Sequence, residues 1–576
     1  MKNNRWKTLG RVLKLVYKTS PLCAIIRDIV FLLNVFLEMY LIFLGGKFID
    51  STVQILLNYK TFDLSKYFIS DSFFLLTVIV IIWLLTVAFP HVYEFLEEKL
   101  TREVSVIMQT EFYNKISREN LEDVETKEFR DLLTLVQSYS FSSVWEVYRL
   151  FIYITKDISS IIFALSFLIL KVGITPIVLV LIAIPEPIAG YINRMKLKNF
   201  RNSSLEKIKW FDYASTLMTR IQFFPEMRVD GTFKELKNDY AKSTNEYKEG
   251  IVERLKHLHI DTTLFAVLGK VGVGAYTIFL LAQTVILKYT IGTFNALFGY
   301  ANTTYNSSYD AINRIFTISN ELDYASHYFE LVNFSGFGEV EHGIKKLTKG
   351  VPNIEFKDLD FAYPNDKKKV INNLNLDIPA KSKIMIIGKD GSGKSTFVKL
   401  LCGLYKITAG DLEIGKYSIR ELARGELKKK ISIIFQDFVN YNLPLKKNIT
   451  LGNDRDNVDS QLYQIAKDIA GIDKMMKIFG LSESQMLGKY TSDGTEISPG
   501  FWQRLAIARV IYRNKEVIIL DEPFTFIDST EASAILKKIL AFAKDKTVIY
   551  ISRDENYTEL FDKVYRLENK KLIENA

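Results

Sequence analysis

A glycine-rich stretch at residues 388–396, GKDGSGKST, constrains the fold of this chain more than any other feature. It follows a strand-like apolar run at 384–387 and precedes a helix-like run at 397–401. The order of strand, glycine loop and helix matches the phosphate-binding P-loop. Its glycines let successive backbone N–H groups point at one anion. The sequence therefore predicts an α/β domain that binds a nucleoside triphosphate.

Individual side chains of this loop have predicted tasks. Lys394 supplies a positive charge for the terminal phosphates, and the Ser395 hydroxyl can ligate Mg²⁺. The predicted nucleotide contacts in the loop are Gly388, Gly391, Ser392, Gly393, Lys394, Ser395 and Thr396.

Composition indicates a second, apolar part of the chain. With 576 residues the chain is too long for one ordinary domain. It combines 48% hydrophobic with 24% charged residues, which predicts segregation into an apolar and a charged region. The net charge of +9 does not require a nucleic-acid partner, because many lysines and arginines flank apolar segments, where they mark the cytoplasmic side of a membrane. The two cysteines, Cys23 and Cys402, are too far apart in sequence to indicate a disulfide framework or a cysteine-ligated metal.

The N-terminal half carries six apolar stretches long enough to span a bilayer. They centre on residues 22–48, 72–96, 152–171, 174–193, 262–287 and 291–316. The pattern predicts an all-α polytopic domain whose long, charged connections lie in the cytoplasm together with the N-terminus. Residues 1–20 predict a basic amphipathic helix on the inner membrane face.

These patterns divide the chain into four predicted parts. A linker is expected where apolar runs give way to glycine and charge, and beyond it β-branched strand patterns alternate with helix patterns. The predicted boundaries are 1–20 for the amphipathic helix, 21–330 for the transmembrane domain, 331–352 for the linker and 353–576 for the nucleotide-binding domain.

A second motif completes the predicted hydrolytic site. The stretch VIILDEP at 517–523 is an apolar strand that ends in two carboxylates, as in a Walker B motif. Asp521 is expected to hold Mg²⁺ through water. Glu522 is placed to orient or deprotonate the attacking water.

With these motifs in place, nearly the whole chain resembles an ABC transporter of the exporter type, with membrane and ATPase domains fused in one polypeptide. The resemblance implies that ATP and Mg²⁺ are bound and that hydrolysis drives export by alternating access. It also implies a location in the cytoplasmic membrane, with the ATPase domain in the cytoplasm. The roles it implies are adenine stacking for Tyr363, contact with Mg²⁺ or water for Gln436, a D-loop carboxylate at Asp528, and a signature segment at 497–509 that includes Ser498 and Gly500.

Two positions depart from the family pattern. In the signature segment, Pro499 replaces a glycine and removes one backbone N–H, and Phe501 replaces the usual glutamine. At the position of the family's switch histidine the chain has Arg553, and all five histidines precede the predicted ATPase domain. Arginine suits phosphate but cannot shuttle a proton at neutral pH. We therefore expect slow or unequal ATP sites, with Glu522, Gln436 and Arg553 as the catalytic residues.

The departures leave the assembly and the cargo open. A heterodimer with a second, different half-transporter is favoured slightly over a homodimer. Segments 119–129 and 223–236 are expected to couple the two domains, and the second resembles a segment of peptide and lantibiotic exporters. A peptide or peptide-like cargo is predicted by this analogy. The alternatives are export of a lipid or amphipathic drug, and a weakly hydrolytic regulatory subunit.

Among the charged residues, Glu38, Glu186 and Lys270 lie within apolar runs. A lone charge there costs on the order of 3 kcal/mol by insertion scales. The residues can line a cavity for charged cargo, or Lys270 can pair with one of the acids as a structural bridge. The sequence does not choose between these interpretations.

Overall fold

The structure of the chain is a computed structural model, which describes residues 5–58, 67–68, 70–220, 223–334, 343–364, 366, 368–423, 425–452 and 457–575. The chain divides into two units. The helical unit comprises Met1–Ser117 and Asp131–Phe334, and the α/β unit comprises Arg118–Arg130 and Ser335–Ala576. The predicted fold class, a helical domain followed by an α/β domain, is confirmed.

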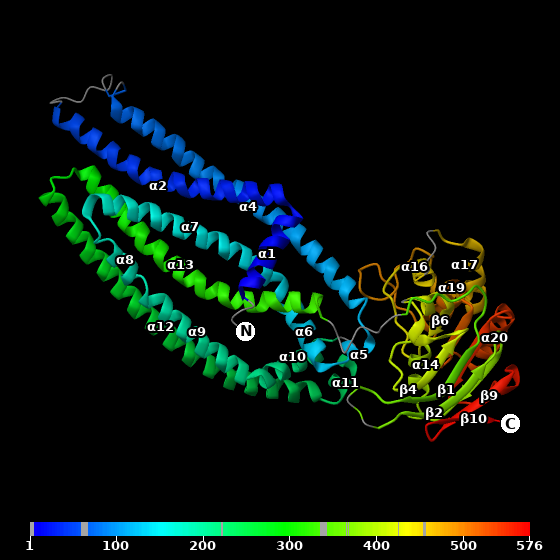
Figure 1. Cartoon of the computed structure of the whole chain (residues 1–576). Helices are drawn as coiled ribbons and strands as arrows, with labels where there is room; N and C mark the ends of the chain where they lie inside the picture. Colours follow the sequence, from blue (N-terminus) through cyan, green and yellow to red (C-terminus); the bar gives the residue numbers. More distant parts are fainter. Residues whose placement is uncertain are drawn as a thin grey trace. The chain divides into compact units, whose positions relative to one another are not determined.

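Long helices make up the helical unit, and Figure 1 shows α2 beside α4 and α9 beside α12. The unit begins with α1, whose Leu9, Val12 and Val16 are buried while Trp6 is exposed, as an amphipathic sequence requires. The helices are α1 (Arg5–Thr19), α2 (Pro21–Asn58), α4 (Asp71–Ile116), α6 (Lys127–Leu135), the π-helix η2 (Val136–Ser140), α7 (Phe141–Val172), α8 (Ile177–Ile182), α9 (Pro185–Ser203), α10 (Leu205–Thr219), α11 (Phe224–Val229), α12 (Thr232–Ile286) and α13 (Ile291–Val332).

Within the described residues, five helical segments are long and apolar enough to cross a membrane. They are Pro21–Leu57, Asp71–Ile116, Lys127–Val172, Ile177–Arg201 and Thr232–Ile286. The sixth predicted span, 291–316, lies in α13, a helix of 42 residues that carries a polar run and is not among the five. Large apolar side chains such as Trp83 and Leu170 are exposed, at 57% and 84%. Such surfaces suit a lipid environment.

The fourth predicted span is interrupted. Helix α8 ends at Ile182 and α9 begins at Pro185. Proline lacks the N–H that would continue the helix, and its ring clashes with the preceding turn. Pro185 and Pro187 therefore account for a break in this span.

Two sheets form the α/β unit. The antiparallel sheet has the order β2-β1-β4-β5, and the six-stranded sheet has the order β10-β9-β3-β8-β7-β6. The strands are β1 (Ile354–Phe361), β2 (Ile371–Ile378), β3 (Lys383–Ile387), β4 (Ala409–Ile414), β5 (Tyr417–Ser418), β6 (Ile431–Ile434), β7 (Val517–Asp521), β8 (Thr547–Ser552), β9 (Lys563–Glu568) and β10 (Lys571–Asn575). The helices are α5 (Leu121–Val124), α14 (Lys394–Leu401), η4 (Ile419–Glu421), α15 (Glu426–Lys430), α16 (Leu445–Thr450), α17 (Ser460–Ala470), α18 (Ile472–Phe479), α19 (Pro499–Arg513), α20 (Ser529–Phe542) and η5 (Thr558–Leu560).

Strand register brings three motifs to one edge of the larger sheet. Strands β3, β8 and β7 are parallel neighbours, with Ile387 opposite Ser552 and Asp521 opposite Ile551. The loops that leave these strands therefore begin side by side, at the carboxyl edge where α/β proteins bind ligands.

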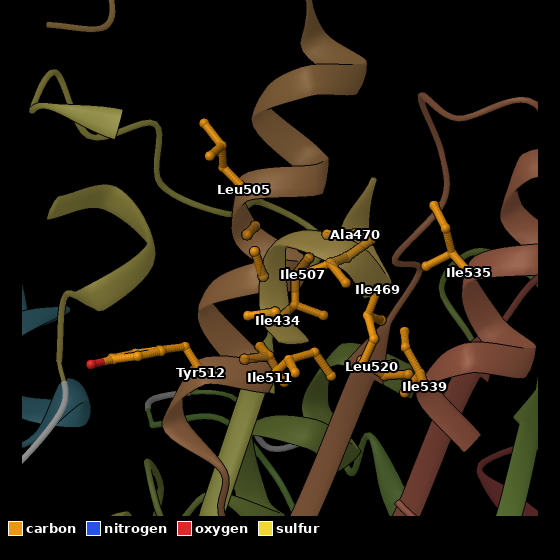
Figure 2. Close-up of a cluster of buried hydrophobic side chains, with 14 of the residues drawn as sticks. Ile434, Ile469, Ala470, Leu505, Ile507, Ile511, Tyr512, Leu520, Ile535 and Ile539 are labelled. Atoms are coloured by element: carbon orange, nitrogen blue, oxygen red, sulfur yellow. The ribbon is translucent and has the colours of Figure 1, made fainter. Parts of the chain in front are cut away.

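A buried apolar cluster fixes α19 against this sheet. Figure 2 shows Ile434 of β6 and Leu520 of β7 among side chains of α17, α19 and α20. Twelve of the fifteen residues of α19 are buried, and they include Leu505 and Ile511 at 0% exposure. Since the helix is held along its length, the position of its N-terminus is also fixed.

The short helix α5 belongs to the α/β unit although the boundaries predicted from the sequence, 21–330, place it in the membrane domain. The Glu122 carboxylate accepts a hydrogen bond from the Lys406 backbone N–H, and burial raises the Glu122 pKa. The Tyr405 hydroxyl donates to Glu125 at 2.7 Å. Leu121 packs against the core beside β1 and β2. Part of the predicted linker 331–352, residues 335–342, lies outside the described residues.

Replacing Tyr405 with phenylalanine removes the donor to Glu125. A hydrogen bond contributes about 1 kcal/mol net, so we expect amide exchange in residues 118–130 to accelerate roughly fivefold in hydrogen–deuterium exchange of the full chain. Tyr490→Phe is the matched control, because its side chain is 83% exposed. Equal exchange in Tyr405→Phe and wild type would contradict this docking of α5.

Candidate nucleotide-binding and hydrolytic site

The P-loop connects β3 to α14, as its sequence predicts. Gly391 and Gly393 have φ angles of 77° and 108°, which are accessible to glycine at little cost. The Lys394 ammonium is buried and donates to the carbonyls of Gly388 at 2.5 Å and Lys389 at 3.1 Å. The Ser392 hydroxyl is buried and has no hydrogen-bond partner within the described part of the chain. A buried, unpaired hydroxyl beside a buried ammonium fits a bound phosphate.

Tyr363 lies beside this loop. Its hydroxyl is 2.9 Å from the Thr396 hydroxyl, and its ring meets Phe361 and Tyr405 edge-on at 5.1 and 5.3 Å between centroids. The predicted adenine-stacking residue is therefore tied to the start of α14.

The final residue of β7, Asp521, is 3% exposed. Burial raises its pKa to about 6, and the neighbouring Glu522 charge adds to this, while Lys394 and the Gln436 backbone N–H oppose it. Ser395 lies one residue into α14 and is exposed. The described residues contain no group of three or more His, Cys, Asp or Glu side chains that could hold a metal ion by themselves. One carboxylate with a hydroxyl and an amide suits Mg²⁺, which retains several waters when bound by protein.

Glu522 has a left-handed backbone, with φ 47°, although it is not glycine. Such strain persists only where the surroundings impose it, and it is concentrated at functional sites. Its backbone N–H donates to the Ile551 carbonyl at 3.0 Å. The carboxylate, 10% exposed, accepts from the Gln436 amide at 3.2 Å and lies 3.9 Å from the Lys394 ammonium.

Arg553 follows β8 and contacts the same carboxylate. Its Nε donates to the two Glu522 oxygens at 2.8 and 2.9 Å, and its Nη1 donates to Asp390 at 2.7 Å. The hydrogen bond with Glu522 raises the Arg553 pKa. The structure therefore brings Arg553 to Glu522 and to the P-loop. Sequence reasoning missed Asp390, although its negative charge inside a phosphate-binding loop was a visible signal.

The signature segment forms the N-terminus of α19. Ser498 caps the helix, its Oγ accepting from the Phe501 N–H at 3.3 Å. Pro499 is the first helical residue, where an N–H has no intrahelical acceptor and proline is well tolerated. A Cβ on Gly500 would lie 2.6 Å from the Phe526 carbonyl, so glycine is required there. Phe501 is fully buried against Phe479, which places its bulk in the core.

Three polar residues of α19 have structural tasks that the sequence did not reveal. The Gln503 carboxamide accepts from the Phe526 N–H at 2.8 Å and donates to the Glu522 carbonyl at 3.4 Å. Arg504 donates to the Ala470 carbonyl and pairs with Glu531. Arg509 donates to the Asn448 carbonyl at 3.0 Å. The signal for these roles was that polar residues alternate with apolar ones on every side of the 499–513 segment, so that some polar side chains have to be buried and need partners.

Asp528 begins α20. Its carboxylate accepts from the Thr530 backbone N–H at 2.9 Å and from the Thr530 hydroxyl, and these bonds lower its pKa. It is exposed. In this structure its observed interactions are those of a helix cap.

Comparison with known proteins identifies the family. Residues 371–525 match the family model described as ABC transporter. The chain carries an ABC transporter domain at these residues. It is 25% identical to the subtilin transport ATP-binding protein SpaT of Bacillus subtilis over 83% of this chain and 78% of SpaT. It is 23% identical to the nisin transport ATP-binding protein NisT of Lactococcus lactis subsp. lactis over 97% of this chain and 91% of NisT.

The fold agrees with a solved member of this family. A structure of a bacterial Atm1-family ABC exporter with ATP bound superposes with a TM-score of 0.77 and 19% identity, over 95% of this chain and 94% of that one. The chain therefore has the fused membrane and ATPase architecture of an ABC exporter. Its activity is ATP hydrolysis coupled to transport, as the resemblance of the sequence implied.

Replacing Asp521 with asparagine should stabilise the protein in the absence of nucleotide and Mg²⁺. The Asp521 pKa in the folded state, about 6, exceeds its ordinary value. The folded chain therefore binds more protons than the unfolded chain between the ordinary pKa of 3.8 and about 6, and its stability falls as pH rises through that window. We expect Asp521→Asn to melt a few degrees higher than wild type at pH 7.5, and the difference to shrink towards pH 5.

The control for this experiment is Asp545→Asn, an exposed carboxylate paired with Lys381 at 3.6 Å. It should melt within a degree or so of wild type, because exposed pairs contribute little. Addition of ATP and Mg²⁺ should stabilise wild type and Asp545→Asn more than Asp521→Asn, which loses a Mg²⁺ ligand but keeps the phosphate contacts of the P-loop. A melting temperature of Asp521→Asn below that of wild type at pH 7.5 would show that the buried charge is compensated.

Proposed function

We propose that this chain is one half of an exporter of the cytoplasmic membrane that moves a peptide or peptide-like substrate outward, driven by ATP. The observation that supports the cargo class most directly is the similarity to SpaT and NisT, relatives named for subtilin and nisin transport, over most of their lengths. The P-loop, Asp521 and Glu522 at one sheet edge supply the energy-converting site. The ATPase domain then lies in the cytoplasm.

In hydrolysis, Lys394 and Ser392 hold the terminal phosphates, and Ser395, Gln436 and Asp521 would hold Mg²⁺, which neutralises phosphate charge when bound. Glu522 orients the attacking water and takes its proton. The water oxygen bonds to the terminal phosphorus as the bond from that phosphorus to the bridging oxygen breaks, and ADP leaves with the electron pair. This assigns Glu522 as the general base.

We further propose that the chain pairs with a second, different half-transporter. Its signature segment lacks the N–H of Pro499, which weakens it as a cap for a partner's nucleotide. Glu522 is retained and held by hydrogen bonds, so the P-loop of this chain forms the competent site, completed by the partner's signature. Arg553 in place of histidine makes that site slow.

Polar side chains in the helical unit are proposed to contact cargo. The Lys270 ammonium is exposed, donates to Asn306 at 3.3 Å and lies 4.8 Å from the centre of the Tyr305 ring. Glu186 lies within hydrogen-bonding reach of Tyr309 and in the electrostatic range of Lys270. An exposed ammonium within a membrane span, anchored by an amide, is a functional candidate by default. Glu38 accepts from Asn34 at 2.9 Å and is satisfied locally.

Replacing Glu522 with glutamine tests the hydrolytic assignment and the assembly together. In complex purified from native membranes through a tag on this chain, we expect a second half-transporter in equal amount. Glu522→Gln should lower ATPase turnover at least about 100-fold while ATP binding is kept, because the base is lost but the phosphate contacts stay. Glu574→Gln, an exposed surface variant, should retain turnover. Unchanged ATPase turnover in Glu522→Gln would show that the partner subunit carries out the hydrolysis. A purified complex that contains a single kind of polypeptide would indicate a homodimer.

Cargo class is tested in proteoliposomes of the purified complex. A linear lantibiotic-type precursor peptide should stimulate ATPase turnover and accumulate inside inverted vesicles, whereas lipid and amphipathic dyes should not. Lys270→Gln should raise the half-stimulating peptide concentration several-fold with the maximal rate retained, because a uniform binding contact is lost. Lys242→Gln on the same helix is the control. Stimulation by lipid or dye alone would overturn the peptide proposal.

A further inference from the structure

The P-loop of this chain contains a carboxylate, that of Asp390, which phosphate binding does not require. Asp390 lies between Lys389 and Gly391, in a loop whose backbone N–H groups bind polyphosphate. A negative charge at this place repels a bound triphosphate unless it is compensated. Its side chain is 69% exposed, so burial does not suppress the charge.

One side chain compensates it. Arg553 donates through Nη1 to Asp390 at 2.7 Å and through Nε to both Glu522 oxygens at 2.8 and 2.9 Å. The planar guanidinium can satisfy both carboxylates at once because its donors form a rigid fork. Its remaining nitrogen, Nη2, makes no hydrogen bond within the described part of the chain.

The other charges nearby define what Arg553 balances. Lys394 lies 3.9 Å from the Glu522 carboxylate, and Asp554 adds negative charge next to Arg553 in sequence. Without Arg553, Asp390 would lose its ion-pair partner, and the Glu522 carboxylate would keep the Lys394 ammonium, 3.9 Å away, as its cation. Arginine at this position therefore has a second task that histidine, which is largely neutral at pH 7.5, would perform poorly.

We propose that Asp390 and Arg553 act as one pair: Asp390 is a positioning residue that holds Arg553 at the phosphate-binding edge, and Arg553 cancels the charge of Asp390. Arg553 also donates to both oxygens of the Glu522 carboxylate. When a triphosphate binds, its terminal oxygens compete for the guanidinium and free Glu522 to receive the water. The inference rests on the proposed function, in which this site binds ATP and hydrolyses it at Glu522.

The proposal predicts the sign of a double-mutant cycle. Removing Arg553 leaves Asp390 uncompensated beside the phosphates, so nucleotide binding weakens. Removing Asp390 in addition abolishes that repulsion, so binding recovers. If the two residues act separately, Asp390→Asn changes binding by the same factor in both backgrounds.

Binding is measured with N-methylanthraniloyl-ATP and Mg²⁺ on the full-length chain, as wild type, Asp390→Asn, Arg553→His and the double variant. We expect Arg553→His to raise the dissociation constant of the analogue about tenfold. In the Arg553→His background, Asp390→Asn should lower that constant about fivefold. In the wild-type background, Asp390→Asn should change it less than twofold. Arg553→Lys should weaken binding less than Arg553→His, because an ammonium restores charge but not the fork. Melting temperatures establish that each variant is folded.

The exposed pair Lys381–Asp545, at 3.6 Å, gives the control cycle, and Lys381→Gln with Asp545→Asn should leave binding of the analogue unchanged. The proposal that the two residues act as one pair is overturned if Asp390→Asn changes the affinity for the analogue by the same factor, within twofold, in the wild-type and Arg553→His backgrounds. If wild type binds the analogue and the cycle shows coupling but no ATP is hydrolysed, the pair stands and the proposed hydrolysis at Glu522 fails. The two ideas are thus separable.

Discussion

The parallel pairing of β3, β8 and β7 is the constraint on which the nucleotide site depends. Each strand is apolar and buried on both faces, and β8 is buried at all six positions. Strands of this kind pack only in the interior of an α/β layer, which forces their loops to the edges of the sheet. Three segments far apart in sequence, beginning at Gly388, Glu522 and Arg553, therefore leave the sheet side by side.

Electrostatics at this edge is unbalanced towards negative charge. Lys394 and Arg553 face the carboxylates of Asp390, Asp521 and Glu522, and Asp521 lies in the most buried position. Burial of a carboxylate is costly, and the nearby Lys394 offsets that cost only in part, which is why the pKa of Asp521 is raised. The divalent cation that accompanies ATP would relieve that cost.

Buried charges also occur in the helical unit, where they are compensated by ion pairs. Arg27 is fully buried, with Asp28 at 3.1 Å and Glu97 at 2.5 Å, and Asp157 pairs with Arg314. Arg27 and Asp28 are neighbours on α2, whereas Glu97 lies on α4. Asp157 lies on α7 and Arg314 on α13. The Arg27–Glu97 and Asp157–Arg314 pairs therefore join helices that apolar packing alone would hold less specifically. Unpaired, each charge would be strongly destabilising in an apolar surrounding. The paired residues are therefore read as structural, in contrast to the exposed Lys270.

The sequence by itself determined the fold class, the P-loop and the Walker B strand, because glycine spacing and apolar runs act locally. It also determined that Pro499 and Arg553 are unusual. It did not show that Phe501 packs into the core or that Arg553 joins Asp390 to Glu522. Nor did it show that α5 groups with the α/β unit, or that Arg27 and Asp157 inside the apolar stretches have partners. Only the tertiary structure decided these points, because a side chain's partner across elements depends on helix rotation and strand register, which local sequence patterns do not specify.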